Sequence, residues 1–405
     1  MADDGKWFRR AYRRAVVDMH IPDWDPAFLS AFDADEYVQR LVEARAQSVV
    51  AYAHSHVGLF NYPTQVGRQH QGLQGRDLVQ EIIDRCHARQ IAVVVYVSLI
   101  FDRWAADQHP EWRMRTWDDR PMGEGGRHGL LCPNSPYREY VRAFTAEISQ
   151  RFAFEGIRFD MTFWPGVCYC PHCQQRFAAA VGGHIPRVVD WLDERWVAFQ
   201  RCREQWLVEF AALATDTVRQ HRPAATVEHQ SSTFPLDWVF GVSEPLARQN
   251  DFLQGDFYGD FLQGSFVRKL LEDLTPARPF GFETSFALDL SNHTTPKSEA
   301  LLEAKAAAAL ADHCAFIFID GIDPVGTLNP LVYRRMGRIF DRLMPLYPHL
   351  GGERVREWPC ISAAPRSSLL PATAAPWPTR TAPTRTWTAP WRSAGTCCRT
   401  TSRSA

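Results

Sequence analysis

The stretch Gly156-Ile157-Arg158-Phe159-Asp160 reads as a short buried strand that ends in a carboxylate. Side chains alternate between the two faces of a strand, so Arg158 and Asp160 share one face while Ile157 and Phe159 share the other. We expect the apolar face to point outward and the charged face inward. An inward Arg beside an Asp keeps that carboxylate ionised, which suits a nucleophile or a group that stabilises a developing cation. A buried structural ion pair is the alternative interpretation.

The composition is that of a large globular protein. Hydrophobic side chains make up 45% of the 405 residues and aromatic ones 12%, which is enough for a barrel-sized core plus something extra. The formal net charge is −1, but six of the 45 Lys and Arg residues lie in the last 44 residues, which contain no acid. The first 361 residues therefore carry about −7, and this balance argues against a nucleic-acid-binding face.

Location and redox state are inferred from the same sequence. The N-terminus lacks a charged segment leading into an apolar run, and no stretch approaches the ~18 apolar residues needed to cross a bilayer. We therefore expect a cytoplasmic protein with no membrane partner. Of the ten Cys residues, seven lie outside residues 168–173, a distribution that suits reduced thiols better than a disulfide framework.

Short runs rich in β-branched and aromatic residues alternate with amphipathic helical stretches, a pattern typical of parallel βα units. The eight expected strands are Ala15–Met19, Ser48–Ala53, Ile91–Ser98, Gly156–Met161, Ala225–Ser231, Phe252–Phe257, Pro279–Ser285 and Ala315–Asp320. The expected helices between them include Asp77–Arg89, Pro136–Phe152, Asp190–Arg219 and Pro296–Asp312. Eight such units predict a (β/α)8 barrel, an α/β fold whose active-site residues project from the C-terminal strand ends.

Several of the predicted strand ends carry carboxylates, and a pair of carboxyl groups is what glycoside hydrolysis requires. Asp160 supplies one of the pair. We expect Glu283 to be the other, because an acid near the end of an apolar strand is partly desolvated and its pKa is raised, as a general acid requires. Glu228 and Asp256 are the alternatives for this role, and we expect both to contact the substrate. Each of them could instead cap a helix or pair with an Arg.

The remaining candidates suit the binding of a sugar. His20, His54 and His56 follow the first two strands and can hydrogen-bond to hydroxyl groups, as can Tyr96 at the end of the third strand. Arg158 is expected to reach the substrate from the fourth strand, and Trp164 to offer a flat apolar surface to a ring. Three His at strand ends could alternatively bind a catalytic metal, which would make the chain a metal-dependent hydrolase.

Several motifs between about residues 12 and 350 resemble a family of hypothetical glycosyl hydrolases that includes the family 151 α-L-fucosidases, related to the family 29 fucosidases. They are Ser55-His56-Val57-Gly58, Tyr62-Pro63-Thr64 with Gly67, His109-Pro110-Glu111-Trp112, Leu131 to Pro136, Gly156 to Asp160 and Cys168 to Cys173. The resemblance implies a (β/α)8 barrel and a retaining, exo-acting mechanism in which a strand-four Asp, here Asp160, is the nucleophile. It also implies a further C-terminal domain and a homo-oligomer where that domain is intact.

A second resemblance concerns the cysteines. Cys132 in Cys-Pro-Asn-Ser-Pro, together with Cys168-x-Cys170-x-x-Cys173, is similar to the structural zinc element of family 42 β-galactosidases. Four thiolates close a tetrahedral site, so such a zinc would hold a loop and take no part in catalysis, which needs no cofactor here. Reduced, metal-free cysteines are the alternative. Family 42 enzymes place the acid/base on strand four and the nucleophile on strand seven, which would exchange the roles of Asp160 and Glu283.

The domain organisation divides near residue 350. We expect the barrel to span residues 1–350 and residues 351–405 to hold the truncated start of a further domain and a low-complexity tail. From Ser362 onward the chain has no Asp, Glu, Lys, Val, Ile, Phe or Tyr, which predicts disorder and is compatible with a frameshift or a natural tail. The sequence thus favours an α-L-fucosidase-like hydrolase, with a β-galactosidase-like exoglycosidase or an inactive sugar-binding barrel as alternatives.

Overall fold

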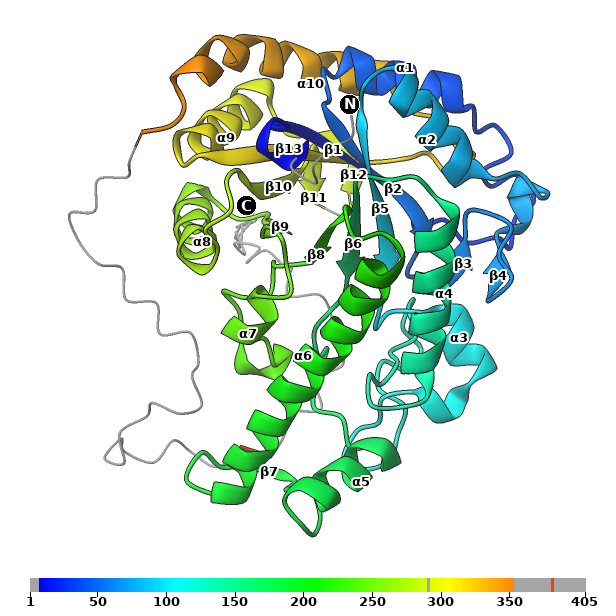
Figure 1. Cartoon of the computed structure of the whole chain (residues 1–405), viewed down its shortest axis with the longest axis vertical. Helices are drawn as coiled ribbons and strands as arrows, with labels where there is room; N and C mark the ends of the chain where they lie inside the picture. The colour runs from blue at the N-terminus through cyan, green and yellow to red at the C-terminus, as the bar shows by residue number, and fades with distance from the viewer. Residues whose placement is uncertain (1–6, 290–291, 353–379, 382–405) are drawn as a thin grey trace, which may run out of the picture.

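Eight parallel strands form the centre of the computed structural model, which describes residues 7–289, 292–352 and 380–381 (Figure 1). They are β1 (Arg13–Asp18), β2 (Ser48–His54), β5 (Ala92–Ser98), β6 (Gly156–Asp160), β8 (Thr226–His229), β9 (Gln254–Asp256), β10 (Phe280–Ser285) and β13 (Cys314–Gly321). Their order in the sheet is β8-β6-β5-β2-β1-β13-β10-β9. The two end strands are linked by backbone hydrogen bonds from Asp251 to Val227 and from Ser231 to Gln254, so the sheet is a nearly closed barrel.

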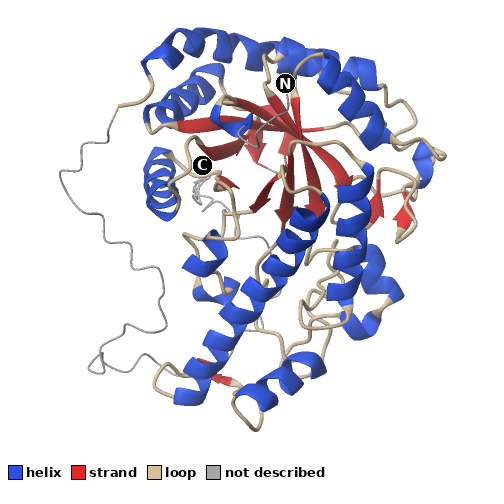
Figure 2. Ribbon diagram, in the orientation of Figure 1, coloured by secondary structure: helices blue, strands red, loops and turns tan. Residues whose placement is uncertain are grey.

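Helices surround this barrel, as the colouring by secondary structure shows (Figure 2). The longer ones are α1 (Ala34–Glu43), α2 (Leu78–Ala88), α4 (Tyr137–Arg151), α5 (Pro171–Ala180), α6 (Glu194–His221), α8 (Phe261–Leu274), α9 (Glu299–Ala311) and α10 (Pro330–Leu343), and the short ones are α3 (Arg103–Gln108) and α7 (Glu244–Ala247). Five α-helices begin at an Asp whose side chain accepts a backbone N–H of the first turn, namely α1, α2, α3, α6 and α8. The predicted (β/α)8 fold is confirmed.

Small elements decorate the loops. The strands β3 (Leu59–Phe60) and β4 (Arg68–Gln69) extend the sheet beside β2, β11 (Ala287–Asp289) pairs with β12 (Asn292–Pro296), and β7 (Val188–Val189) pairs with β14 (Arg380–Thr381). Single 3-10 turns occupy Trp7–Arg9, Gln71–Leu73, Pro110–Trp112, Trp238–Phe240 and Met344–His349. The predicted low-complexity tail lies outside the described residues apart from 380–381. Within the described part of the chain, no helix is long and apolar enough to cross a membrane.

The interior of the barrel is polar along one line of side chains. Arg158 on β6 reaches Glu283 on β10, a contact that spans the barrel interior because the two strands are not neighbours in the sheet. Ile157 and Phe159 have no exposed surface. The pleat of β6 therefore turns its charged residues inward, as its sequence predicts.

Candidate active site and candidate metal centre

Asp160 is the last residue of β6 and lies at the C-terminal end of the barrel, 8% exposed. The hydroxyl of Tyr96 donates a hydrogen bond of 2.5 Å to its Oδ2, and the backbone N–H of Met161 donates one of 2.8 Å to its Oδ1. Burial raises the pKa of Asp160, whereas the Arg158 guanidinium and these two hydrogen bonds act to lower it. The carboxylate is thus oriented on both oxygens, as a nucleophile must be.

Arg158 connects two carboxylates that lie deeper in the barrel. Its Nη1 donates to Oε1 of Glu283, and its Nε lies 3.9 Å from Oε1 of Glu228. Glu283 is 0% exposed and Glu228 is 2% exposed. Burial raises the pKa of both carboxyl groups, that of Glu228 to about 8. The same burial would lower the pKa of Arg158, but the two carboxylates outweigh it and the guanidinium stays charged.

Three of the expected site residues therefore lie deeper than Asp160. A general acid must touch the glycosidic oxygen, but Glu283 has no exposed surface and is bound to Arg158, so the structure does not offer it as the acid/base. Glu228 and Arg158 are likewise buried, 2% and 4% exposed, and Arg158 contacts both Glu228 and Glu283. The reason is position along the strand. Glu283 lies two residues before the end of β10 and below its rim, whereas Asp160 is the terminal residue of β6.

Asp256 is a second carboxylate with accessible surface. It ends β9 and is partly exposed. Its Oδ1 accepts hydrogen bonds from Gln230 Nε2, at 2.9 Å, and from the Ser232 hydroxyl, while the Tyr258 hydroxyl donates to Oδ2 at 2.6 Å. The negative charge of Asp256 raises the pKa of Asp160, so the two carboxylates lie within electrostatic range of each other. The pair Asp160 and Asp256 therefore has the composition that glycoside hydrolysis needs.

The tautomer of His56 follows from its neighbours. The Ser98 hydroxyl has one proton and donates it to the Phe101 carbonyl at 2.6 Å, so its 2.7 Å contact with Nδ1 of His56 requires an N–H on that nitrogen. Burial and the neighbouring His20 lower the pKa of His56 well below its usual range, so the ring is neutral. Its Nε2 is then an acceptor, 3.5 Å from the Tyr96 hydroxyl and 3.8 Å from Oδ2 of Asp160.

His20 and His128 join His56 in what we call the histidine cluster. The rings of His20 and His56 stack with their centroids 3.8 Å apart, and His128 lies edge-on to His56 at 5.1 Å. Nδ1 of His20 accepts the backbone N–H of His56, and its Nε2 lies 3.2 Å from Oδ1 of Asp18. Burial lowers the pKa of His128 to about 3. His56 and His128 are thus neutral, and the ring nitrogens of the cluster can donate to or accept from sugar hydroxyls beside Asp160.

His54 and Trp164 do not lie where the sequence suggested. His54 is 0% exposed and contacts Ser98 O, Asp102 and the ring of Phe144 on α4, so it belongs to the layer between barrel and helices. Trp164 is also 0% exposed, and its Nε1 donates to the carbonyl of Arg203. Among the described residues the His side chains form no metal-binding group, which removes the geometric basis for a metal site of His20, His54 and His56.

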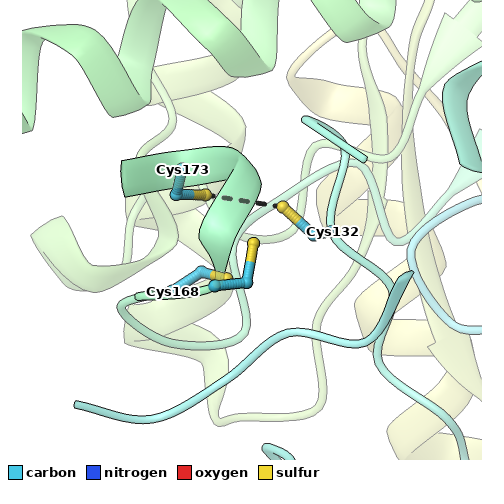
Figure 3. A group of neighbouring side chains, drawn as sticks. Cys132, Cys168 and Cys173 are labelled. Atoms are coloured by element: carbon cyan, nitrogen blue, oxygen red, sulfur yellow. Dashed lines mark hydrogen bonds between the residues drawn. The ribbon is translucent and has the colours of Figure 1, made fainter. Parts of the chain in front are cut away.

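The four expected cysteines do converge, and Figure 3 shows three of them with labels. Cys132, Cys168, Cys170 and Cys173 are buried, and their sulfur atoms lie within 4.8 Å of one another. In a tetrahedral zinc site with Zn–S bonds of about 2.3 Å the sulfurs lie roughly 3.8 Å apart, and the Cys132 and Cys173 sulfurs are 3.4 Å apart. The donor set and its spacing therefore fit a closed, structural zinc site.

Some residues of the site were not predicted. Tyr258 shares the inward face of Asp256 by simple alternation, so the sequence did hold a signal for it. Asp18 ends β1 on the same inward face, where the Tyr52 hydroxyl bonds to it. His128 follows a glycine-rich loop whose path is set by tertiary contacts, and no sequence pattern points to it.

Comparison with known proteins places this geometry in context. The family described as "Hypothetical glycosyl hydrolase 6" matches residues 33–161, a segment that includes His54, His56, Tyr96 and Asp160. A β-galactosidase, BglY of Alicyclobacillus acidocaldarius, is 25% identical over 232 residues, which are 56% of this chain and 31% of that protein. The resemblance to hypothetical glycosyl hydrolases expected from the motifs is thereby confirmed, and the chain spans about a third of the length of this curated relative.

Two solved structures share the fold. Alpha-L-fucosidase isoenzyme 2 from Paenibacillus thiaminolyticus superposes with a TM-score of 0.71 at 19% identity, covering 84% of this chain and 50% of that one. The β-galactosidase from Rahnella sp. R3 gives a TM-score of 0.62 at 18% identity, covering 84% of this chain and 56% of that one. Both likenesses show that the fold of this chain is shared with these two structures.

Proposed function

We propose that this chain is the catalytic barrel of a retaining exo-acting glycoside hydrolase, with Asp160 as nucleophile and Asp256 as acid/base. The observation that carries the proposal is the pair of carboxylates that end β6 and β9, Asp160 and Asp256, the first held on both oxygens by Tyr96 and Met161. Active sites of (β/α)8 enzymes lie at this end. The similarity to the glycosyl hydrolase family covers Asp160 itself.

The chemistry proceeds in two displacements. In the first, an Asp160 oxygen attacks the anomeric carbon while Asp256 gives its proton to the glycosidic oxygen, and the bond from carbon to that oxygen breaks. A glycosyl ester of Asp160 results. In the second, Asp256 takes a proton from water, whose oxygen attacks the same carbon and releases Asp160. The anomeric configuration is retained because it is inverted twice.

The buried layer supports this role for Asp160. Arg158 lies two residues earlier on the same strand, and its charge favours the ionised carboxylate. Glu283 and Glu228 partner that guanidinium below the site. In this interpretation Glu283 is a structural counter-ion, and Asp256 takes the acid/base role that we expected for Glu283.

An α-L-fucoside is the substrate that we propose first. A β-galactosidase-like activity is the second candidate, favoured by the curated relative that the sequence matches. The burial of Glu283 is the observation that supports this order of the two candidates. The family 42 arrangement needs a strand-seven nucleophile in contact with the sugar, and here the strand-seven carboxylate is 0% exposed and bound to Arg158. The strand-four carboxylate is the one that reaches the rim.

The test is hydrolysis of a panel of aryl glycosides, led by an α-L-fucoside and a β-D-galactoside. Asp160→Gly should abolish turnover, and added azide should restore it with the glycosyl azide of inverted configuration. Asp256→Gly should lose little rate on a dinitrophenyl glycoside, which needs no protonation, and much more on a poorer leaving group. The glycosyl azide that Asp256→Gly forms should keep the anomeric configuration of the substrate. The assignment of Asp256 as acid/base would be overturned if Glu283→Gln, and not Asp256→Gly, showed this dependence on the leaving group. Binding of sugar without any hydrolysis would favour a sugar-binding barrel.

We also propose that Cys132, Cys168, Cys170 and Cys173 hold one zinc ion with a structural role. The ion would tie the segment between β5 and α4, which carries Cys132, to the loop after β6, which carries Cys168 and Cys170, and to the first turn of α5, which carries Cys173. These loops follow the strands of Tyr96 and Asp160. Elemental analysis of the purified chain should find one zinc per molecule. The zinc proposal would be contradicted if no metal were found and the thiols of these four cysteines could be alkylated.

A further inference from the structure

Asn134 lies between the cysteine cluster and the ion pair of Arg176 with Glu209. Its backbone N–H contacts Sγ of Cys132 at 3.4 Å, and its side-chain Nδ2 contacts Sγ of Cys173 at 3.3 Å. On its other side, Nη1 of Arg176 donates to Oδ1 of Asn134 at 2.7 Å, and Nη2 of the same guanidinium reaches Oε2 of Glu209 at 2.5 Å. Asn134 is buried, 9% exposed.

The contact with Arg176 fixes the orientation of the side-chain amide of Asn134. A guanidinium has only donors, so the atom of Asn134 that faces Arg176 must be the oxygen, and the NH2 group must face Cys173. Arg176 lies three residues after Cys173 on α5, so the two share a helix face. Its guanidinium also packs over the ring of Trp206 at 5.1 Å. The side-chain NH2 of Asn134 is therefore held toward Sγ of Cys173 by contacts among three elements, namely the loop after β5, α5 and α6.

We infer that Asn134 is an outer-sphere positioning residue of the metal centre, which donates a hydrogen bond to the Cys173 thiolate and is oriented by Arg176 and Glu209. Four thiolates around one divalent ion carry a net negative charge in a buried place, and donors to the sulfur atoms stabilise that charge. The inference rests on the zinc site proposed above. It does not depend on the glycosidase assignment.

The experiment compares Asn134→Asp with Asn134→Ala in the full chain. Asp has nearly the same size as Asn but puts a carboxylate oxygen where the N–H was. If Asn134 acts by donating, Asn134→Asp should bind zinc most weakly, by about 10 to 100-fold relative to wild type, and Asn134→Ala should fall between. If Asn134 acts only by filling space, the order reverses and Asn134→Asp behaves like wild type.

The readout is zinc itself. Release to a chromophoric chelator gives the rate, competition with the same chelator gives the affinity, and circular dichroism shows that each variant is folded. Gln175→Ala is the matched control, because Gln175 is exposed on the same helix, two residues from Cys173. Should Asn134→Asp fail to fold, Arg176→Met keeps the aliphatic stem over Trp206, frees the amide, and should also release zinc faster.

The outcomes separate the two proposals. Wild type that binds no zinc overturns both the zinc site and the role of Asn134. Wild type that holds zinc, with Asn134→Asp retaining it equally well, overturns only the role of Asn134. Glycosidase activity enters neither comparison.

Discussion

The hydroxyl of Tyr96 donates a 2.5 Å hydrogen bond to Oδ2 of Asp160 from the neighbouring strand β5, two residues before that strand ends. The phenol ring is itself fixed by stacking on Tyr52, with centroids 3.8 Å apart. A rigid donor thus holds one oxygen of the proposed nucleophile in place and favours its ionised form.

Tyr96→Phe should lower kcat/KM by about tenfold, since one hydrogen bond to a charged group is worth about 1.5 kcal/mol or more. Loss of a donor to the carboxylate raises the pKa of Asp160. The nucleophile must be ionised, so the acidic limb of the pH profile of kcat/KM should move to higher pH. Tyr52→Phe is the control, because its hydroxyl bonds to Asp18 and its loss should leave that limb in place. An unmoved limb in Tyr96→Phe would contradict the role given to Tyr96.

His54 and His56 should respond differently to replacement by Ala. His56 lies beside Asp160 and offers an acceptor, so His56→Ala should stay folded and lose about tenfold in kcat/KM, the worth of one hydrogen bond. His54 is fully buried between β2 and α4, so His54→Ala should instead lower the free energy of unfolding by about 2 to 4 kcal/mol. Urea titrations and initial rates on both variants check this. Equal loss of activity at equal stability would mean that His54 also contacts substrate.

Breaking the buried pair of Arg158 should be costly. Arg158→Met leaves the buried Glu283 without its cation and should lower the free energy of unfolding by about 3 to 5 kcal/mol. The double variant Arg158→Met/Glu283→Gln removes the stranded charge and should recover part of the loss. Denaturant unfolding of wild type, both single variants and the double variant gives the coupling. Additive effects would show that the two side chains do not act as a pair.

Glu228 should make stability depend on pH. Its pKa is raised from an ordinary 4.5 to about 8 because it is buried. Between these values the native state holds a proton that the unfolded state has lost, so this group makes stability fall as pH rises, by at most about 1.4 kcal/mol per pH unit. Glu228→Gln should flatten that decline. The measurement is unfolding free energy from pH 5 to 8 for both proteins, and an identical slope in the variant would refute the assignment.

Removal of zinc should act on stability before it acts on catalysis. Prolonged dialysis against a chelator should lower the melting temperature, because the ion would tie two loops that the cysteines bring together. Activity at low temperature should outlast the loss of metal, since no step of the proposed mechanism uses it. Melting curves and elemental analysis on the same samples test this, with magnesium-saturated chelator as the control. Immediate loss of activity with an unchanged melting temperature would point to a catalytic metal.

The sequence alone determined the barrel and the place of Asp160 in it. All eight expected strands are present with ends shifted by only a few residues, because hydrophobic runs between turn signals are a local property of the chain. The inward direction of Arg158 and Asp160 followed from the alternation of a single strand. The four cysteines could be grouped because their spacing is itself a ligand pattern.

The tertiary structure decided how deep a side chain lies below the rim of the barrel and, on β2, which face of the sheet it takes. Alternation says which face a side chain takes, but not how far below the rim it lies, and this height depends on the tilt and offset of strands in the closed sheet. Glu283 and Asp256 are register partners on β10 and β9, yet Glu283 has no exposed surface and Asp256 is partly exposed. Glu283 is held by Arg158 from a strand that is not its neighbour, a contact that neither strand reveals by itself. On β2 a register shift between Tyr52 and His54 breaks the alternation, as an inserted residue does. Tyr52 therefore points into the barrel while His54 turns outward to α4, an outcome fixed by pairing with the neighbouring strand and invisible in β2 by itself.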